Sequence, residues 1–165
     1  MPLGGGRYLL EPMVLGRLIH SAGIRPGDVV LELGSATGYG AAILARLAKS
    51  VVAVESDAKL LQQARTNLAG QRNVALFEQR LDLGYAERAP YDVILISGAV
   101  AEISPALLDQ LAEGGRLVTV IETRAGQLGE AVLLQRGPTG IARRALFEAG
   151  VQSLPGFRPA PSFAF

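Results

Sequence analysis

The residues from Asp28 to Gly40 constrain the fold more than any other stretch of this 165-residue chain. The apolar run over residues 29–33 carries β-branched side chains and one acidic residue, Glu32, which is typical of a strand buried in a parallel sheet. Three glycines follow, and after them residues 41–48 are mostly strong helix formers. The sequence therefore predicts a strand, a glycine-rich turn and a helix. In open α/β sheets a ligand binds over such a turn.

The residues around this turn indicate which ligand it would take. The glycine spacing is G-x-x-x-G-x-G, with Ala36 in place of the middle glycine of the dinucleotide fingerprint G-x-G-x-x-G. Glu32 would repel a pyrophosphate, whereas S-adenosylmethionine has no phosphate and carries an ammonium and a sulfonium. The second apolar run, residues 50–55, ends in Glu55, about 20 residues after the first glycine, where a carboxylate can accept from two ribose hydroxyls. These features favour S-adenosylmethionine over a turn without a ligand.

Periodicity along the rest of the chain predicts an α/β fold. Strands are expected at 73–77, 91–96 and 116–121, and helices from Glu11-Pro12 to a C-cap at Gly23, over 58–68 after an Asp57 cap, and from Ser104 through Leu111. Residues 130–135 and 141–147 are separated by a short turn, so they are expected to be antiparallel. The sequence thus predicts one Rossmann-like methyltransferase domain, with a mixed seven-stranded sheet, helices on both faces and a C-terminal antiparallel hairpin. A flexible lead (1–10) and an irregular tail (154–165) are expected at its ends.

Composition excludes several classes of function. The chain is 49% hydrophobic and 19% charged, which is typical of a globular domain, and its net charge of +1 does not favour binding to nucleic acid. It has no cysteine and one histidine, which excludes disulfides, thiolate metal sites and multi-histidine metal centres. No apolar run is long enough for a membrane span. We therefore expect no metal, no nucleic acid and no membrane partner, and a cytoplasmic location; no pattern predicts an oligomer.

Several stretches resemble one enzyme family. Glu32-Leu-Gly-Ser-Ala-Thr-Gly-Tyr-Gly40, with the alanine-rich segment after it, resembles the first motif of protein-L-isoaspartate O-methyltransferases. Residues 11–14, 89–94 and 107–115 resemble further motifs of that family, and the resemblance extends over residues 7–148. It implies an S-adenosylmethionine-dependent enzyme that esterifies the carboxylate of isoaspartyl residues in damaged proteins, and hence a role in protein repair.

The sequence departs from the family pattern at three places. Leu10 stands where the family carries a Ser or Thr beside the acceptor, and a leucine can neither donate nor accept a hydrogen bond. Gln79-Arg80-Leu81 stands where the family carries Gly-Asp-Gly beside the adenine amino group. The chain also begins inside the region that precedes the first motif in the family. These departures bear on the acceptor more than on the cofactor.

The residues and the resemblance together give a set of candidate site residues. Tyr39 is expected to face the methionine end of the cofactor, and Ser97, after the fourth predicted strand, is a weak candidate for a polar group near the transferred methyl. The expected cofactor-binding residues are Glu32, Gly34, Ser35, Ala36, Thr37, Gly38, Tyr39, Glu55, Ser56, Gln79, Arg80 and Leu81. The alternatives are a methyltransferase with another acceptor, a cofactor-binding protein without activity, and a nicotinamide dehydrogenase, against which Glu32 argues.

Overall fold

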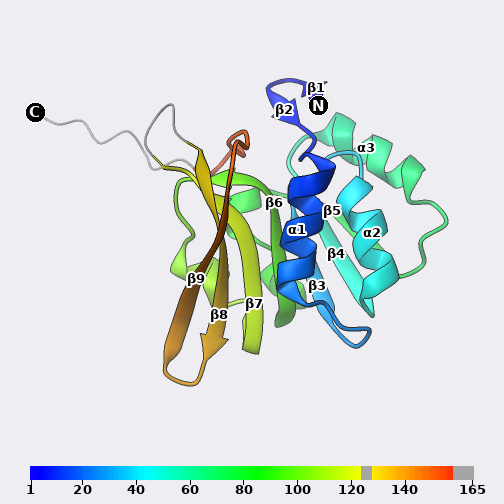
Figure 1. Cartoon of the computed structure of the whole chain (residues 1–165). Coiled ribbons are helices and arrows are strands. Elements are labelled where there is room, and N and C mark those ends of the chain that lie inside the picture. The colour runs from blue at the N-terminus through cyan, green and yellow to red at the C-terminus, as the bar shows by residue number, and fades with distance from the viewer. Residues whose placement is uncertain (124–127, 158–165) are drawn as a thin grey trace, which may run out of the picture.

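The computed structural model describes residues 1–123 and 128–157, and its main body is a seven-stranded sheet with the order β5-β4-β3-β6-β7-β8-β9 (Figure 1). The strands are β3 (Val29–Leu33), β4 (Ser50–Glu55), β5 (Val74–Glu78), β6 (Tyr91–Val100), β7 (Leu111–Ile121), β8 (Gly129–Gly137) and β9 (Gly140–Ala149). The strands from β3 to β7 are mutually parallel, and β8 is antiparallel to both β7 and β9. The predicted mixed sheet with its terminal hairpin is therefore confirmed.

Helices cover the sheet unequally. They are α1 (Pro12–Ala22), α2 (Tyr39–Leu47), α3 (Ala58–Asn67) and α4 (Pro105–Leu108), with short 3-10 turns at Leu81–Leu83 and Ala86–Arg88. One core cluster joins α1 and α2 to one face of the sheet, and a second joins the Leu81–Leu83 turn, α4 and the late residues Leu154 and Phe157 to the other. Because side chains alternate along β3, Glu32 lies on the α1–α2 side of the sheet.

Local sequence signals explain where the helices begin and end. Asp57 Oδ1 accepts from the N–H groups of Lys59 and Leu60, so the expected cap of α3 is confirmed. Gly23 ends α1 in the left-handed conformation, with φ +56°, as its place after the last apolar residue predicts. The Ser104 hydroxyl accepts from the N–H of Leu107 at the start of α4.

Two element boundaries differ from the sequence predictions. The fourth strand does not end before Ser97 but continues to Val100, because an irregularity in the β6–β7 register between Leu95 and Ala99 lets pairing resume beyond it. The helix after Ser104 ends at Leu108, and Leu111 already pairs with Tyr91 as the start of β7.

The lead over residues 1–10, which was expected to be flexible, contains regular structure. It forms a separate two-stranded antiparallel hairpin, β1 (Pro2–Gly4) and β2 (Arg7–Tyr8), joined by glycines with φ from +57° to +90°. Arg7 and Leu10 are buried, while the other residues of the hairpin are half-buried or exposed. The predicted tail is described only up to Phe157, and the prolines flanking Ala160 lie outside the described residues.

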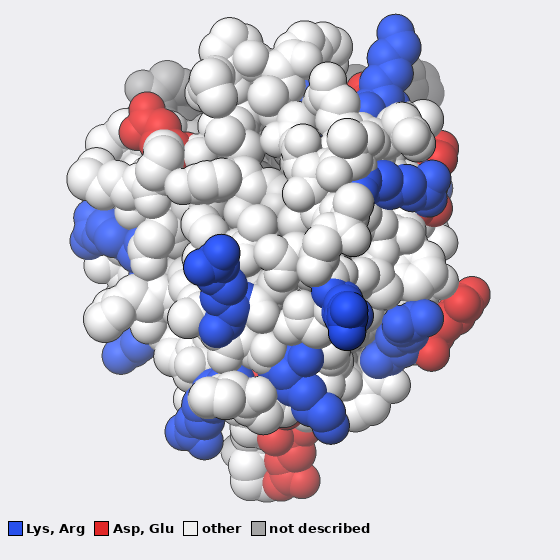
Figure 2. Space-filling model, turned by 90° about the vertical axis from the view of Figure 1, so that its right-hand side faces the viewer, with Lys and Arg blue, Asp and Glu red and all other residues white. Residues whose placement is uncertain are grey.

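On the face that carries α2 and α3, lysine and arginine side chains lie mostly across the lower half, and aspartate and glutamate lie at its margins (Figure 2). Among the described residues no helix is long and apolar enough to cross a membrane, and no group of three or more His, Asp or Glu side chains could hold a metal ion.

Candidate cofactor site

The site is built where β3 and β4 end side by side. These strands are parallel neighbours, so their carboxyl ends meet at one edge of the sheet, with Leu33 opposite Val54. The N–H groups of Gly34 and Ser35 donate to the carbonyl of Val54 at 2.9 and 3.2 Å, which holds the turn against β4. The turn reaches α2 through positive φ angles at Gly34 (+80°), Ala36 (+50°) and Gly38 (+89°). Within the turn, the N–H of Gly38 donates to the carbonyl of Ser35 at 2.8 Å, which closes the turn onto the start of α2.

Glu55, at the end of β4, is completely buried and fully paired. Oε2 accepts from the N–H of Ala36 at 2.8 Å, and Oε1 accepts from the N–H groups of Ser56 at 2.8 Å and Asp57 at 3.0 Å. Both carboxylate oxygens also accept from the guanidinium of Arg7, with Nη2 at 2.8 Å from Oε2 and Nη1 donating to Oε1. Arg7 thus holds the positions on Glu55 that ribose hydroxyls were expected to take.

Glu32 lies in a different electrostatic environment. It is 1% exposed, its Oε1 accepts from the Ser97 hydroxyl at 2.8 Å, and its Oε2 has no hydrogen-bond partner. Burial raises the pKa of this carboxyl to about 7, although the hydrogen bond from Ser97 works in the opposite direction. A Cβ at position 40 would collide with this carboxyl, so only glycine fits the first turn of α2 above it. The free oxygen is suited to accept from a cationic group of a ligand.

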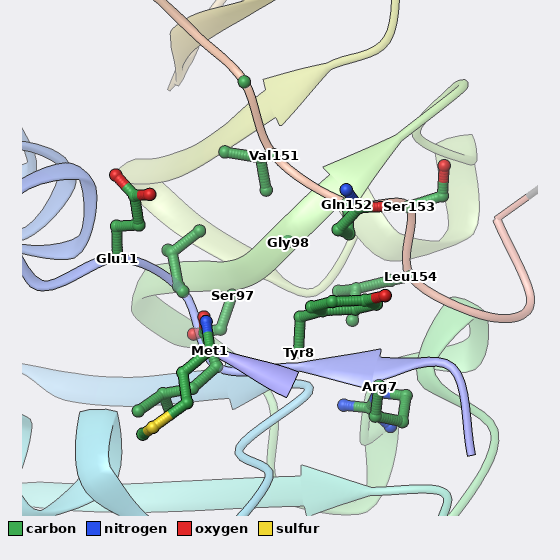
Figure 3. A pocket seen from close by; sticks show the side chains of 13 residues that line it. Met1, Arg7, Tyr8, Glu11, Ser97, Gly98, Val151, Gln152, Ser153 and Leu154 are labelled. Atoms are coloured by element: carbon green, nitrogen blue, oxygen red, sulfur yellow. The ribbon is translucent and has the colours of Figure 1, made fainter. Parts of the chain in front are cut away.

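Two cavities lie beside the hairpin β1–β2, and only the smaller is bordered by one of the two carboxylates. The smaller, about 10 Å³, is bordered by Glu32, Ser35, Leu10 and Ser97 and has room for about one water. The larger, about 140 Å³, lies between the hairpin β1–β2 and residues 150–154, with Ser97 and Gly98 at its base (Figure 3). Leu154 packs closely on both Gly98 and Gly34, so the end of the described chain closes one side of the site.

The remaining predicted residues of the turn lie around the same edge of the sheet. Ser35 is buried, and its hydroxyl has no partner. The carbonyl of Thr37 accepts from the side-chain amide of Asn67 at 2.9 Å, which ties the turn to the end of α3. Tyr39 is 41% exposed and does not border either cavity described above, so its expected contact with the cofactor stays a prediction.

The segment expected near the adenine follows β5. The N–H of Gln79 donates to the carbonyl of Glu55 at 3.2 Å, which places this segment beside the end of β4. The Gln79 side-chain amide donates to the carbonyl of Gly84 at 3.0 Å, which leaves its oxygen as an acceptor. The Arg80 side chain is turned to the surface and pairs with Asp82 at 2.6 Å, whereas Leu81 is buried in the core.

Two residues of the site were missed by sequence reasoning. Arg7 lies in a glycine-rich lead, where neither periodicity nor a motif indicated a buried side chain. Leu154 lies in a segment of proline and small residues, and its N–H donates to the carbonyl of Ala99 at 2.8 Å. Neither segment carries a motif or a periodicity that identifies a partner for these side chains.

This mixed seven-stranded sheet with its C-terminal antiparallel hairpin, and with a glycine-rich turn beside acidic residues near the ends of β3 and β4, defines a Rossmann-like methyltransferase fold. A sequence model described as "Protein-L-isoaspartate(D-aspartate) O-methyltransferase (PCMT)" matches residues 1–141. The chain belongs to this family.

Individual relatives agree with this assignment. The chain is 42% identical to the protein-L-isoaspartate O-methyltransferase of Koribacter versatilis over 120 residues, which are 72% of this chain and 54% of the relative. A solved protein-L-isoaspartate O-methyltransferase superimposes with a TM-score of 0.81 at 28% identity, covering 88% of this chain and 47% of that one. A Plasmodium falciparum structure titled as a putative member, in complex with S-adenosyl-L-homocysteine, shares the fold with a TM-score of 0.78 at 19% identity, covering 93% and 78%. The chain spans between about half and two thirds of the length of the curated relatives it matches.

Proposed function

We propose that this chain binds S-adenosylmethionine over the turn from Gly34 to Gly38 and methylates the carboxylate of isoaspartyl residues in protein or peptide substrates. One observation carries the proposal: two buried carboxylates, Glu32 and Glu55, lie on either side of the glycine-rich turn that joins β3 to α2. Family membership supports the choice of cofactor and acceptor.

The side chains divide into roles along the cofactor. Glu55 would accept from the ribose hydroxyls, and the free Oε2 of Glu32 would accept from the ammonium of the methionine part. Gln79, beside the end of β4, would contact the adenine, and Ser35 has an unpartnered hydroxyl for the amino-acid part. When bound, the cofactor supplies a methyl group already activated by its sulfonium.

The acceptor requires little chemistry from the protein. A carboxylate is ionised at neutral pH, so transfer needs no general base. The protein has to align the acceptor and exclude water, and the enclosed space above Ser97 and Gly98 is suited to that task. Ser97 donates to Glu32, so its contribution here is to hold the carboxyl that would bind the cofactor.

Leu10 favours a second candidate function, a cofactor-binding protein without methyltransferase activity. It is 7% exposed and borders both cavities, where the family carries a hydroxyl. An apolar side chain at this position can pack against the acceptor but cannot donate a hydrogen bond to its carboxylate.

Binding and turnover can be measured separately. We expect isothermal titration calorimetry to detect S-adenosylhomocysteine binding and no NAD binding. Methanol should be released from an isoaspartyl peptide incubated with S-adenosylmethionine, and not from the same peptide with a normal aspartate. Binding without methanol release, with release gained in Leu10→Ser, would favour the second candidate. Absence of binding would contradict the proposed function.

The proposed partners follow from the same site. We propose proteins or peptides as substrates and a cytoplasmic location, with which the cysteine-free sequence is compatible. The net charge of +1 supports a protein substrate over a nucleic acid, whose phosphates favour a strongly basic surface.

A further inference from the structure

Arg7 is a buried residue in a hairpin that otherwise lies at the periphery of the protein. Its side chain is 6% exposed, whereas Gly6 and Tyr8 on either side of it are exposed. The strands β1 and β2 pair with each other and form a sheet separate from the seven-stranded one. The ion pair with Glu55 is therefore a principal attachment of this hairpin to the body of the protein.

The carboxylate of Glu55 has no free position for another donor. Three backbone N–H groups, the two terminal guanidinium nitrogens of Arg7 and, at 3.4 Å, the Ser56 hydroxyl donate to it, and a carboxylate offers about four lone-pair sites. The backbone donors belong to the turn after β3 and to the start of α3, so they are fixed by the fold. Two ribose hydroxyls could gain access only by replacing the guanidinium of Arg7.

The space around the carboxylates leads to the same conclusion. Sites for ligands of drug size enclose roughly 300–1,000 Å³, whereas the two cavities here measure about 140 and about 10 Å³. Tyr8, Leu9 and Leu10, which follow Arg7 directly, line both cavities. Moving the hairpin would therefore free Glu55 and enlarge the pocket at the same time.

The closed arrangement also leaves buried polar atoms without partners. Arg7 Nε, Glu32 Oε2 and Ser35 Oγ lack hydrogen bonds in the described part of the chain. Such atoms cost free energy when buried, so they favour a second state in which water or a ligand reaches them.

We propose that Arg7 is an internal competitor for the ribose site and thereby sets the affinity of the protein for its cofactor. The proposal rests on the proposed function, because it assumes a ligand with a ribose diol at Glu55. In the cofactor-free protein the guanidinium occupies the carboxylate and the hairpin covers the site. A ligand binds only the fraction of molecules in which this pair is open, so its apparent affinity falls by that fraction.

The test is the affinity for S-adenosylhomocysteine, which has no sulfonium and so avoids direct charge repulsion by Arg7. We expect Arg7→Ala to bind it at least tenfold more tightly than the wild type in isothermal titration calorimetry, and Arg7→Lys to lie between them. Arg143→Ala is the matched control, because Arg143 pairs with Glu130 at an exposed position on the terminal hairpin. It should bind as the wild type does.

A double-mutant cycle tests whether Arg7 changes the affinity through its contact with Glu55. If Arg7 acts through Glu55, Arg7→Ala should change the affinity little in a Glu55→Ala background, and the double variant should bind more weakly than Arg7→Ala alone. Equal or weaker binding by Arg7→Ala, with the wild type binding normally, would overturn the inference and leave the proposed function standing. No binding by either protein would contradict the proposed function itself.

Hydrogen exchange supplies a readout that does not depend on affinity. The N–H of Leu9 donates to the carbonyl of Met1 at 2.8 Å and reports on the closed hairpin. We expect exchange over residues 1–9 to rise in Arg7→Ala without ligand, and to rise in the wild type when S-adenosylhomocysteine saturates it. Slower exchange in the saturated wild type would show that the hairpin clamps the ligand, and would overturn the inference.

Discussion

Glu32 and Glu55 are the same side chain at the ends of adjacent strands, yet the fold gives them opposite environments. Glu55 is surrounded by donors, including a cation, whereas Glu32 has one hydroxyl donor and one oxygen without a partner. The difference arises because one N–H of the turn, two N–H groups that follow β4 and the guanidinium of Arg7 all converge on Glu55. Glu32, beneath the first turn of α2, therefore carries the raised pKa.

The raised pKa makes stability depend on pH. Because the folded-state pKa of Glu32 is about 7, against 4.5 for an ordinary glutamate, the stabilising effect of the protonated form is complete below pH 4.5. It is lost as pH rises through about 7. Glu32→Gln has no carboxyl to ionise, so its stability relative to the wild type should rise between pH 4.5 and about pH 7. Above about pH 7 the gain should be roughly 3 kcal/mol. Urea unfolding at pH 5 and pH 8 measures this difference, with exposed Glu78→Gln as the control; an equal difference at both pH values would contradict it.

Sequence reasoning identified the two carboxylates because parallel neighbours bring their ends together whatever the rest of the chain does. It could not identify Arg7 as the partner of Glu55, because that contact joins residues 48 positions apart through a glycine-rich lead without periodicity. The binding roles expected for Tyr39, Arg80 and Leu81 stay predictions. Here Arg80 and Leu81 point to the surface and into the core, respectively.

At the scale of the elements, glycine at position 40 determines how α2 can start. The glycine lies directly over the Glu32 carboxyl, so a methyl group there would collide with it. Glycine in a helix is otherwise unfavourable by about 1 kcal/mol relative to alanine. The close approach of α2 to β3 thus requires glycine at a helical position where alanine would stabilise the helix more.

Two glycine substitutions separate the steric effect at position 40 from the effect of glycine on helix propensity. Gly40→Ala should destabilise the protein by roughly 1–3 kcal/mol, because the added methyl displaces a buried carboxyl. Gly16→Ala in α1 meets no atom within 4 Å and should stabilise the protein by roughly 0.5–1 kcal/mol. Thermal unfolding of both variants checks this; a stabilised Gly40→Ala would show that the Glu32 carboxyl can move aside.

The elements themselves were predicted where periodicity is strong. The strands β3 and β4 and the capped helix α3 were found close to their observed bounds, because buried apolar runs and a capping aspartate are local signals. The ends of β6 and α4 were not, because they depend on pairing between strands. Leu111 joins β7 by pairing with Tyr91, and no pattern around Leu111 indicates that partner.

At the scale of the whole molecule, Arg116 joins β7 to the end of α1 and to the residue before β3. From β7, its guanidinium donates to the carbonyls of Ala22 and Gly23 at 2.9 Å each and to Asp28 Oδ2 at 2.8 Å. It thereby satisfies carbonyls at the end of α1 and pairs with the acidic residue just before β3. Residues about 90 positions apart are joined by this one planar group.

Removing this group should lower global stability. Arg116→Ala should cost roughly 2–3 kcal/mol, because the buried Asp28 carboxylate keeps only the N–H of Arg25 and two helix-end carbonyls lose this donor. Arg116→Lys should recover only part of this loss, since an ammonium cannot reproduce the forked geometry. Urea unfolding of both variants measures the effect. Full recovery by lysine would show that charge alone matters.

Leu154 is synthesised after all the other parts of the pocket that it packs against. It packs on Gly34 and Gly98, and the backbone around it pairs with Ala99, yet it is among the last residues that the structure describes. During synthesis the strands, the glycine turn and both carboxylates leave the ribosome well before it. The growing chain can thus assemble the floor of the pocket before the Leu154 wall is synthesised.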